Sequence, residues 1–310
     1  MSVVSSTTIT VPATTANLGA GFDCIGAALS LYNEFKFSLL SSSAGENFVI
    51  SVTGAEAARV STDESNLLYQ AFSKFYEHIG QAPPPVSMEI KLGVPLARGL
   101  GSSATAIAGG LLGANILAGE PLSDNEVIEL AIAMEGHPDN VVPALIGGCR
   151  LAATSENGWE ICDIPWCQEI ICVVAIPDFE LSTKEARSVL PQEVSRADAI
   201  FNTAHLGLLL RGLETGNPQW LKAALQDKLH QPYRQSLIKG YAEVETATKN
   251  AGAYGMVISG AGPTLLALTD TSHSLDVVAA MATAWQNCGV KAEVRSLSLD
   301  TQGARVMKHN

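Results

Sequence analysis

One short segment, residues 95–105, combines three features that bind anions: closely spaced glycines, paired hydroxyls and the start of a helix. It reads P-L-A-R-G-L-G-S-S-A-T. Gly99 and Gly101 permit backbone conformations and close approaches that a Cβ would block. Ser102 and Ser103 then lead into a run of small and apolar residues that is typical of a buried helix. A phosphate here would face unpaired N–H groups and the positive end of a helix dipole, so the segment predicts a nucleotide triphosphate site.

Two better-known phosphate loops fit this segment poorly. A P-loop needs Lys followed by Ser or Thr after its last glycine, whereas Ser102 directly follows Gly101. The dinucleotide fingerprint is closer, because Gly99, Gly101 and Ala104 match G-x-G-x-x-A. However, Glu120, at the distance expected of the ribose-binding acid, lies in a turn before another helix rather than after a second parallel strand. A Rossmann fold is therefore not favoured, and a strand-to-helix turn without a ligand stays open for the loop taken alone.

Further clusters of polar residues interrupt otherwise apolar surroundings. They lie in A-T-T-A-N-L-G-A-G-F-D, in E-G-H-P-D-N-V at a helix end, in L-S-T-K-E-A-R, and in Q-P-Y-R together with the glycine turn S-G-A-G-P-T. Their functional side chains are, in that order, Asn17 and Asp23, then Glu135, His137, Asp139 and Asn140, then Thr183 and Arg187, and finally Arg234. Each cluster has an ordinary interpretation as a turn or a solvated face, but their joint occurrence exceeds what turns require.

Composition favours a compact globular enzyme. The chain has 310 residues, 47% of them hydrophobic and 16% charged, and is long enough for two domains. The net charge of -12 disfavours nucleic acid and anionic membranes as partners. The six cysteines contain no C-x-x-C pair and have no histidine at zinc-finger spacing, which predicts reduced thiols. With no signal-like segment and no run of about 20 apolar residues, we expect a cytoplasmic protein.

The predicted elements alternate between strands and helices. Strands are expected at residues 8–11, 33–40, 47–53, 86–92, 170–176, 255–259, 264–269 and 291–296. Helices are expected at residues 66–78, from 102 onward, at 126–134 behind a Ser123 N-cap, and at 197–214, 218–225, 235–250 and 275–288. The almost wholly apolar strand at 170–176 is typical of a sheet covered on both faces. This order predicts an α+β fold, and we place a domain boundary between residues 1–156 and 157–310.

Taken together and in this order, the clusters resemble the GHMP kinase superfamily. P-L-A-R-G-L-G-S-S-A resembles its ATP loop and S-G-A-G-P-T its C-terminal glycine motif. N-L-G-A-G-F-D, E-G-H-P-D-N-V-V-P-A-L-I-G-G and S-T-K-E-A-R-S-V-L-P are similar to the branch that acts on homoserine. The resemblance implies an N-terminal domain like ribosomal protein S5 domain 2, a ferredoxin-like C-terminal domain and an active site between them. It also implies ATP-dependent phosphorylation of the L-homoserine hydroxyl to O-phospho-L-homoserine, in threonine biosynthesis, and a possible homodimer.

The resemblance further implies which residues hold ATP and Mg²⁺. The nucleotide site would comprise Asn66, near the adenine, and Pro95, Leu96, Ala97, Arg98, Gly99, Leu100, Gly101, Ser102, Ser103, Ala104 and Thr105. Ser103 and Glu135 would hold Mg²⁺, and their oxygen atoms suit this hard cation.

The acceptor must be held by its carboxylate, its ammonium and its hydroxyl. Arg187 and Arg234 are expected to clamp the carboxylate, because planar guanidinium groups bind it bidentately. The remaining substrate-binding candidates are Asp23 and Asp139 for the ammonium, with Asn17 and His137 completing the hydrogen bonds, and Asp139, Asn140 and Thr183 are the catalytic candidates. Whether Asp139 acts as a general base or only binds substrate stays open, because phosphoryl transfer can proceed mainly by positioning and charge stabilisation.

Two alternatives remain beside this interpretation. The chain could be a GHMP kinase for another small alcohol, such as mevalonate or shikimate, although these acceptors lack an ammonium group to pair with Asp23 and Asp139. It could also be a catalytically silent regulator that binds an amino acid. The intact glycine loop with Ser103 and Glu135 argues against that alternative.

Overall fold

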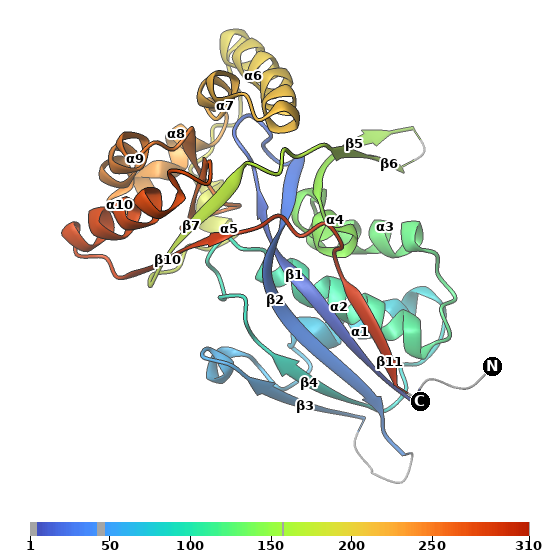
Figure 1. Cartoon of the computed structure of the whole chain (residues 1–310). Coiled ribbons are helices and arrows are strands. Elements are labelled where there is room, and N and C mark those ends of the chain that lie inside the picture. The colour runs from blue at the N-terminus through green and yellow to red at the C-terminus, as the bar shows by residue number, and fades with distance from the viewer. Residues whose placement is uncertain (1–4, 42–46, 157, 310) are drawn as a thin grey trace.

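The computed structural model describes residues 5–41, 47–156 and 158–309. Two sheets organise this part of the chain, and the long strands β1 (Ser6–Ala16) and β2 (Ile25–Leu39) reach from the first sheet toward the second (Figure 1). Within the described residues, every helix is too short or too polar to span a lipid bilayer. All six cysteines are free, as expected.

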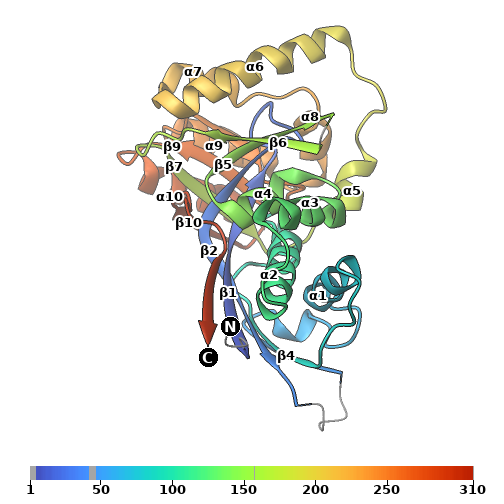
Figure 2. The same ribbon diagram turned by 90° about the vertical axis from the view of Figure 1, so that its right-hand side faces the viewer.

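The first sheet has the order β11-β1-β2-β4-β3, extended by a β5–β6 hairpin that pairs with β2. All pairs are antiparallel except β3 with β4. The other strands are β3 (Phe48–Thr53), β4 (Val86–Lys91), β5 (Cys149–Ser155), β6 (Gly158–Ile164) and β11 (Arg305–His309). One face is covered by α1 (Leu67–His78), α2 (Ser102–Leu117), α3 (Asp124–Glu135) and α4 (Pro138–Ile146), as Figures 1 and 2 show. Phe35 and Phe37 of β2 lie in the buried core that these helices share with the sheet.

The second sheet is antiparallel, with the order β10-β7-β9-β8. Its strands are β7 (Ile171–Pro177), β8 (Gly255–Ile258), β9 (Leu265–Thr269) and β10 (Ala292–Leu297). The accompanying helices are α5 (Thr183–Ser188), α6 (Arg196–Thr215), α7 (Pro218–Ala224), α8 (Gln231–Arg234), α9 (Tyr241–Asn250) and α10 (Ser274–Asn287), with short 3₁₀ turns η1 (Ala57–Arg59) and η2 (Gln235–Leu237). Val173 and Ala175 of β7 face the core built with α9 and α10, whereas Cys172 and Val174 face the core built with α6 and α7. This alternation confirms the sheet covered on both faces.

Several local features match the prediction closely. Ser123 caps α3 with a full capping box, and α1 begins directly after the N-cap Asn66. The helix predicted at 235–250 is divided, because Gly240 takes a left-handed conformation (φ 78°) between η2 and α9.

Three strands of the first sheet, β5, β6 and β11, were not predicted from the sequence. The domain boundary placed after residue 156 falls between β5 and β6, and both of these strands belong to the first sheet. β11 also returns to the first sheet and pairs with β1 from Ser6 with His309 to Thr10 with Arg305. The division at residues 156 and 157 therefore separates strands that share one sheet, and it stays an interpretation of domain organisation.

Candidate active site

The first sheet with its helices forms one unit, and the second sheet with its helices forms another. Residues of both units line one cavity of about 450 Å³. Most of its apolar lining comes from the first unit, including Phe35, Val60, Leu67, Ile90 and Leu92, and Leu181 and Ala261 add to it from the second. The residues from the sequence analysis that line it are Asn17, Asp23, Asn66, Leu96, Ala97, Arg98, Gly99, Gly101, Ser102, Ser103, Glu135, His137, Asp139, Asn140, Thr183, Arg187 and Arg234. Pro95, Leu100, Ala104 and Thr105 are not among the lining residues. The cavity therefore has an apolar part and a strongly charged part.

The glycine loop is held between β1 and the turn at residues 259–263. Gly101 has φ 67°, and a Cβ there would lie 1.9 Å from Thr14 Oγ1. Gly99 has φ 76°, and a Cβ there would lie 2.3 Å from the Ser259 carbonyl oxygen. Gly101 is the N-cap of α2 and provides no side-chain cap, and the first turn carries no acidic residue. The first N–H groups of this 16-residue helix thus remain available to an anion.

Ser103 and Glu135 meet beside the start of α2. The Ser103 hydroxyl donates a hydrogen bond of 2.8 Å to Glu135 Oε1, and Glu135 is the last residue of α3. In the described residues, no group of three or more His, Cys, Asp or Glu side chains could hold a metal ion. The pair supplies two oxygen ligands, which fits Mg²⁺ bound by one or two protein ligands together with phosphate oxygens and water.

Asp23 and Arg187 form a bidentate ion pair across the cavity. The two N–O distances are 3.0 Å and 2.9 Å. Asn17 supports the Asp23 loop, because its Oδ1 accepts the Asp23 N–H at 2.8 Å while its Nδ2 donates to the Gly260 carbonyl at 2.9 Å. Both Asn17 (φ 63°) and Asp23 (φ 57°) adopt left-handed conformations, which are sparsely populated outside glycine. This strained loop therefore holds the Asp23 carboxylate beside the Arg187 guanidinium, which comes from α5.

A second polar group surrounds Asp139, which is 3% exposed at the start of α4. Its Oδ1 lies 2.6 Å from His137 Nδ1 and accepts a longer hydrogen bond of 3.4 Å from Asn140 Nδ2. Asn140 is fixed in turn by the Thr14 hydroxyl, which donates to its Oδ1 at 2.8 Å. Burial alone would lower the pKa of His137, but the hydrogen bond and negative charge of Asp139 outweigh burial and raise it.

Arg234 lies at the base of the site and is 1% exposed. Its Nε donates to the Ala186 carbonyl and its Nη1 to the Gly260 carbonyl, both at 3.0 Å. Burial, together with the charge of Arg187, lowers its pKa to about 10. Among the described residues, Nη2 has no hydrogen-bond acceptor, so this face of the fork is free for a ligand.

Some predicted nucleotide-site residues have structural partners of their own. Asn66 caps α1 through Oδ1 and donates to the Ser61 carbonyl through Nδ2. The Thr105 hydroxyl donates to the Ser102 carbonyl and accepts from Asn33. Arg98 donates to carbonyl groups at and after the end of β7. The local fold therefore accounts for these three side chains without a ligand.

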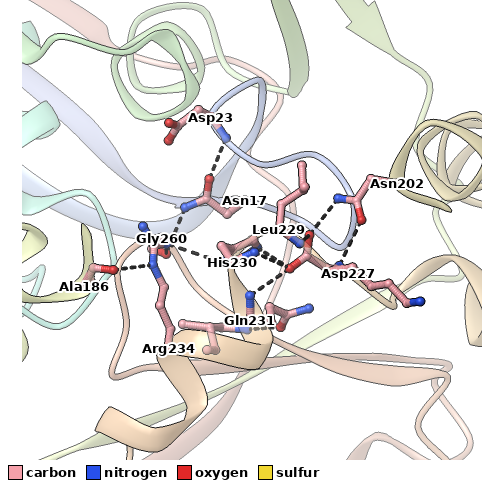
Figure 3. A network of polar contacts seen from close by, with 12 residues as sticks. Asn17, Asp23, Ala186, Asn202, Asp227, Leu229, His230, Gln231, Arg234 and Gly260 are labelled. Carbon is pink, nitrogen blue, oxygen red and sulfur yellow. Dashed lines mark hydrogen bonds and ion pairs between the residues drawn. The ribbon is translucent and has the colours of Figure 1, made fainter. Parts of the chain in front are cut away.

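Sequence reasoning missed a layer of residues behind Arg234. The Phe22 ring lies 5.1 Å from the Arg234 guanidinium and 5.9 Å from that of Arg187, and it stacks on His230. Asp227 accepts hydrogen bonds from the His230 N–H and from Asn202 Nδ2, on the side of His230 away from Arg234 (Figure 3). Phe22 lies within the motif N-L-G-A-G-F-D, but its side chain forms no hydrogen bond and was therefore not considered. The only feature of the sequence that pointed to Asp227 was its position shortly before Q-P-Y-R.

Comparison with known proteins adds a second line of evidence. The family models for the GHMP kinases N terminal domain and the GHMP kinases C terminal match residues 66–148 and 209–287. Homoserine kinases of Nostoc punctiforme and Trichormus variabilis are 73% and 72% identical, covering 98% of this chain and 99% and 100% of theirs. A crystal structure of homoserine kinase from Cytophaga hutchinsonii superposes with a TM-score of 0.88 at 28% identity, covering 99% of each chain. The similarity thus extends over nearly all of the chain.

Proposed function

The chain belongs to the GHMP kinases, and we propose that it transfers the γ-phosphoryl group of ATP to the hydroxyl of L-homoserine, giving O-phospho-L-homoserine for threonine biosynthesis. The observation that carries this proposal is one cavity joining the uncapped start of α2 to a paired carboxylate and guanidinium. The first feature suits a triphosphate, and the second suits an amino acid that carries both charges.

On the nucleotide side, the triphosphate would lie against the start of α2, and the apolar lining would receive the adenine. Ser103 and Glu135 would hold Mg²⁺, which neutralises phosphate charge when it is bound. Ser102 and the backbone N–H groups of the loop would then bind the phosphate oxygens. Asn66 would border the adenine through its position, since its side chain is engaged in capping α1.

On the acceptor side, the free protein already contains the charges that a zwitterion needs. Asp23 and Arg187 pair with each other, and homoserine would replace this contact by pairing its ammonium with one and its carboxylate with the other. Arg234 would complete the carboxylate clamp through its free Nη2. Asp139 and His137 would border the ammonium, which leaves Asn140 and Thr183 near the hydroxyl.

A coupled assay of ADP release over a panel of small alcohols tests the proposal. We expect magnesium-dependent turnover with L-homoserine and much weaker turnover with mevalonate or shikimate, because neither carries an ammonium group. Preference for one of those alcohols would contradict the assigned acceptor. No ADP release with any alcohol would instead identify a silent binding protein.

We further propose that the protein is a cytoplasmic homodimer that binds neither nucleic acid nor membranes. Light scattering of the purified protein should give twice the mass of one chain. A mass equal to one chain would contradict the dimer without affecting the proposed reaction.

A further inference from the structure

We infer that Asn202 and Asp227 are positioning residues that set the place of Arg234 in the acceptor site. Both lie outside the cavity lining, and both are buried. Figure 3 shows the polar contacts that run from Asn202 on α6 through Asp227 to the helix that carries Arg234. The inference rests on the proposed function, in which Arg234 binds the homoserine carboxylate.

The Asp227 carboxylate is saturated by hydrogen bonds. Its Oδ1 accepts from Asn202 Nδ2 at 2.7 Å and from the Leu229 N–H at 3.0 Å. Its Oδ2 accepts from the N–H groups of His230 and Gln231, both at 2.8 Å. Three consecutive backbone N–H groups are thereby held by one charged side chain, which stabilises the direction in which α8 begins. Arg234 is the last residue of this four-residue helix.

Asn202 anchors this turn to the long helix α6. It donates to Asp227 through Nδ2 and accepts the Lys228 N–H at 2.9 Å through Oδ1. On the other side, Gln231 Oε1 accepts the Ile258 N–H at 2.9 Å, which ties α8 to β8. The segment is therefore held from two directions before it reaches Arg234.

Arg234 itself depends on this placement. Its Nε and Nη1 donate to the carbonyls of Ala186 and Gly260, and the Gly260 carbonyl also accepts from Asn17. A shift of α8 would lengthen both donations and turn the free Nη2 away from the acceptor. Charge-assisted hydrogen bonds to a carboxylate are strong and directional, so a small displacement weakens substrate binding selectively.

Kinetics of Asp227→Asn and Asn202→Ala test the inference. An amide nitrogen at the Oδ2 position of Asp227 would face two N–H donors and break the turn, and alanine at 202 removes the anchor. We expect the homoserine KM to rise about tenfold in Asp227→Asn and less in Asn202→Ala, with the ATP KM changed by less than about twofold. Asp198→Asn is the matched control, because it removes a carboxylate from the exposed face of the same helix, next to Lys228. It should leave both KM values unchanged.

A double-mutant cycle separates positioning from general destabilisation. If Asp227 acts through Arg234, adding Asp227→Asn to Arg234→Gln should change the homoserine KM by less than about twofold. Full additivity, an unchanged homoserine KM in the single variants, or parallel rises in both KM values would overturn the inference. Should Asp227→Asn fail to fold, Asn202→Ala carries the same cycle, since it leaves three of the acceptor contacts of Asp227 in place. A wild-type protein inactive on homoserine would instead refute the proposed function.

Discussion

At the scale of single residues, Asp139 is the side chain whose role most affects the mechanism. It is buried at the start of α4, and one of its oxygens is already bound by His137 and Asn140. A loose phosphoryl-transfer transition state needs little help from a base, so we assign the charge of Asp139 to the substrate ammonium. Asp139→Asn should therefore raise the homoserine KM by more than about tenfold and lower kcat by less than about tenfold. A large fall in kcat at saturating homoserine would identify Asp139 as the general base.

The contact between Asp139 and His137 also predicts a pH dependence. Because the pKa of His137 is raised above its ordinary value of 6.5, folding favours the imidazolium. The stabilisation is complete below pH 6.5 and is lost as the pH rises through the folded-state pKa. An NMR titration of the imidazole should show the raised pKa in the wild type and a lower pKa in Asp139→Asn. Equal pKa values in both proteins would show that Asp139 does not hold the proton on His137.

Phe22 is a residue whose contribution comes from its ring alone. It contacts two guanidinium groups and stacks on His230. A cation–π contact is worth about 0.5 to 2 kcal/mol, depending on its exposure to water. Phe22→Leu should therefore raise the homoserine KM by about threefold or more, whereas Phe22→Tyr should keep it near the wild-type value. Equal KM values in the leucine and tyrosine variants would contradict this role for the ring.

At the scale of elements, the start of α2 depends on a backbone that only glycine adopts easily. In Gly101→Ala, the left-handed conformation costs about 1–2 kcal/mol, and the new Cβ also collides with Thr14. Gly119→Ala is the matched control at the other end of the helix, because its φ is also positive (84°) but no atom lies within 4 Å. We expect Gly101→Ala to lower the melting temperature more than the control and to raise the ATP KM. Equal effects of both variants would mean that the close contact with Thr14 is unimportant.

The elements also show which parts of the structure a sequence encodes locally. The Ser123 cap and the helix after Asn66 follow from neighbouring side chains, and the glycine loop was readable because its residue types are unusual together. β11 was not predictable, because its partner lies about 300 residues away and its sequence R-V-M-K-H has no clear alternation of buried and exposed residues.

The residues of the site also differ in how far the sequence predicts their contacts. The chemistry of the polar motifs predicted that Asp23, Asp139 and Arg187 share one site, although their distances along the chain gave no sign of it. All three line the same cavity. The partners of Arg234, in contrast, are the backbone carbonyls of Ala186 and Gly260 and the ring of Phe22, and the residue types alone do not show that these groups meet. Contacts between distant segments are therefore the part that sequence reasoning could not supply, whether they are made by backbone carbonyls or by side chains such as Asn202 and Asp227.

At the scale of the whole molecule, Arg98 joins the glycine loop to the second sheet. It is 8% exposed, and its Nε and Nη2 donate to the carbonyls of Pro177 and Asp178 at 2.9 and 3.2 Å. It also pairs with Glu180 at 3.1 Å. The resemblance assigned Arg98 to nucleotide binding, but these contacts make it first a link between the two units.

Replacing Arg98 should therefore lower the stability of the fold more than it changes the kinetics with ATP. Arg98→Met keeps a similar volume but leaves the buried Pro177 carbonyl and the part-buried Asp178 carbonyl without this donor. The free energy of unfolding should therefore fall by about 1 to 3 kcal/mol in urea denaturation. Arg59→Met is the control, because Arg59 pairs with the same Glu180 from a more exposed position and should change stability by less than about 0.5 kcal/mol. If Arg98→Met instead keeps the wild-type stability and raises only the ATP KM, the guanidinium binds nucleotide and the units are joined by other contacts.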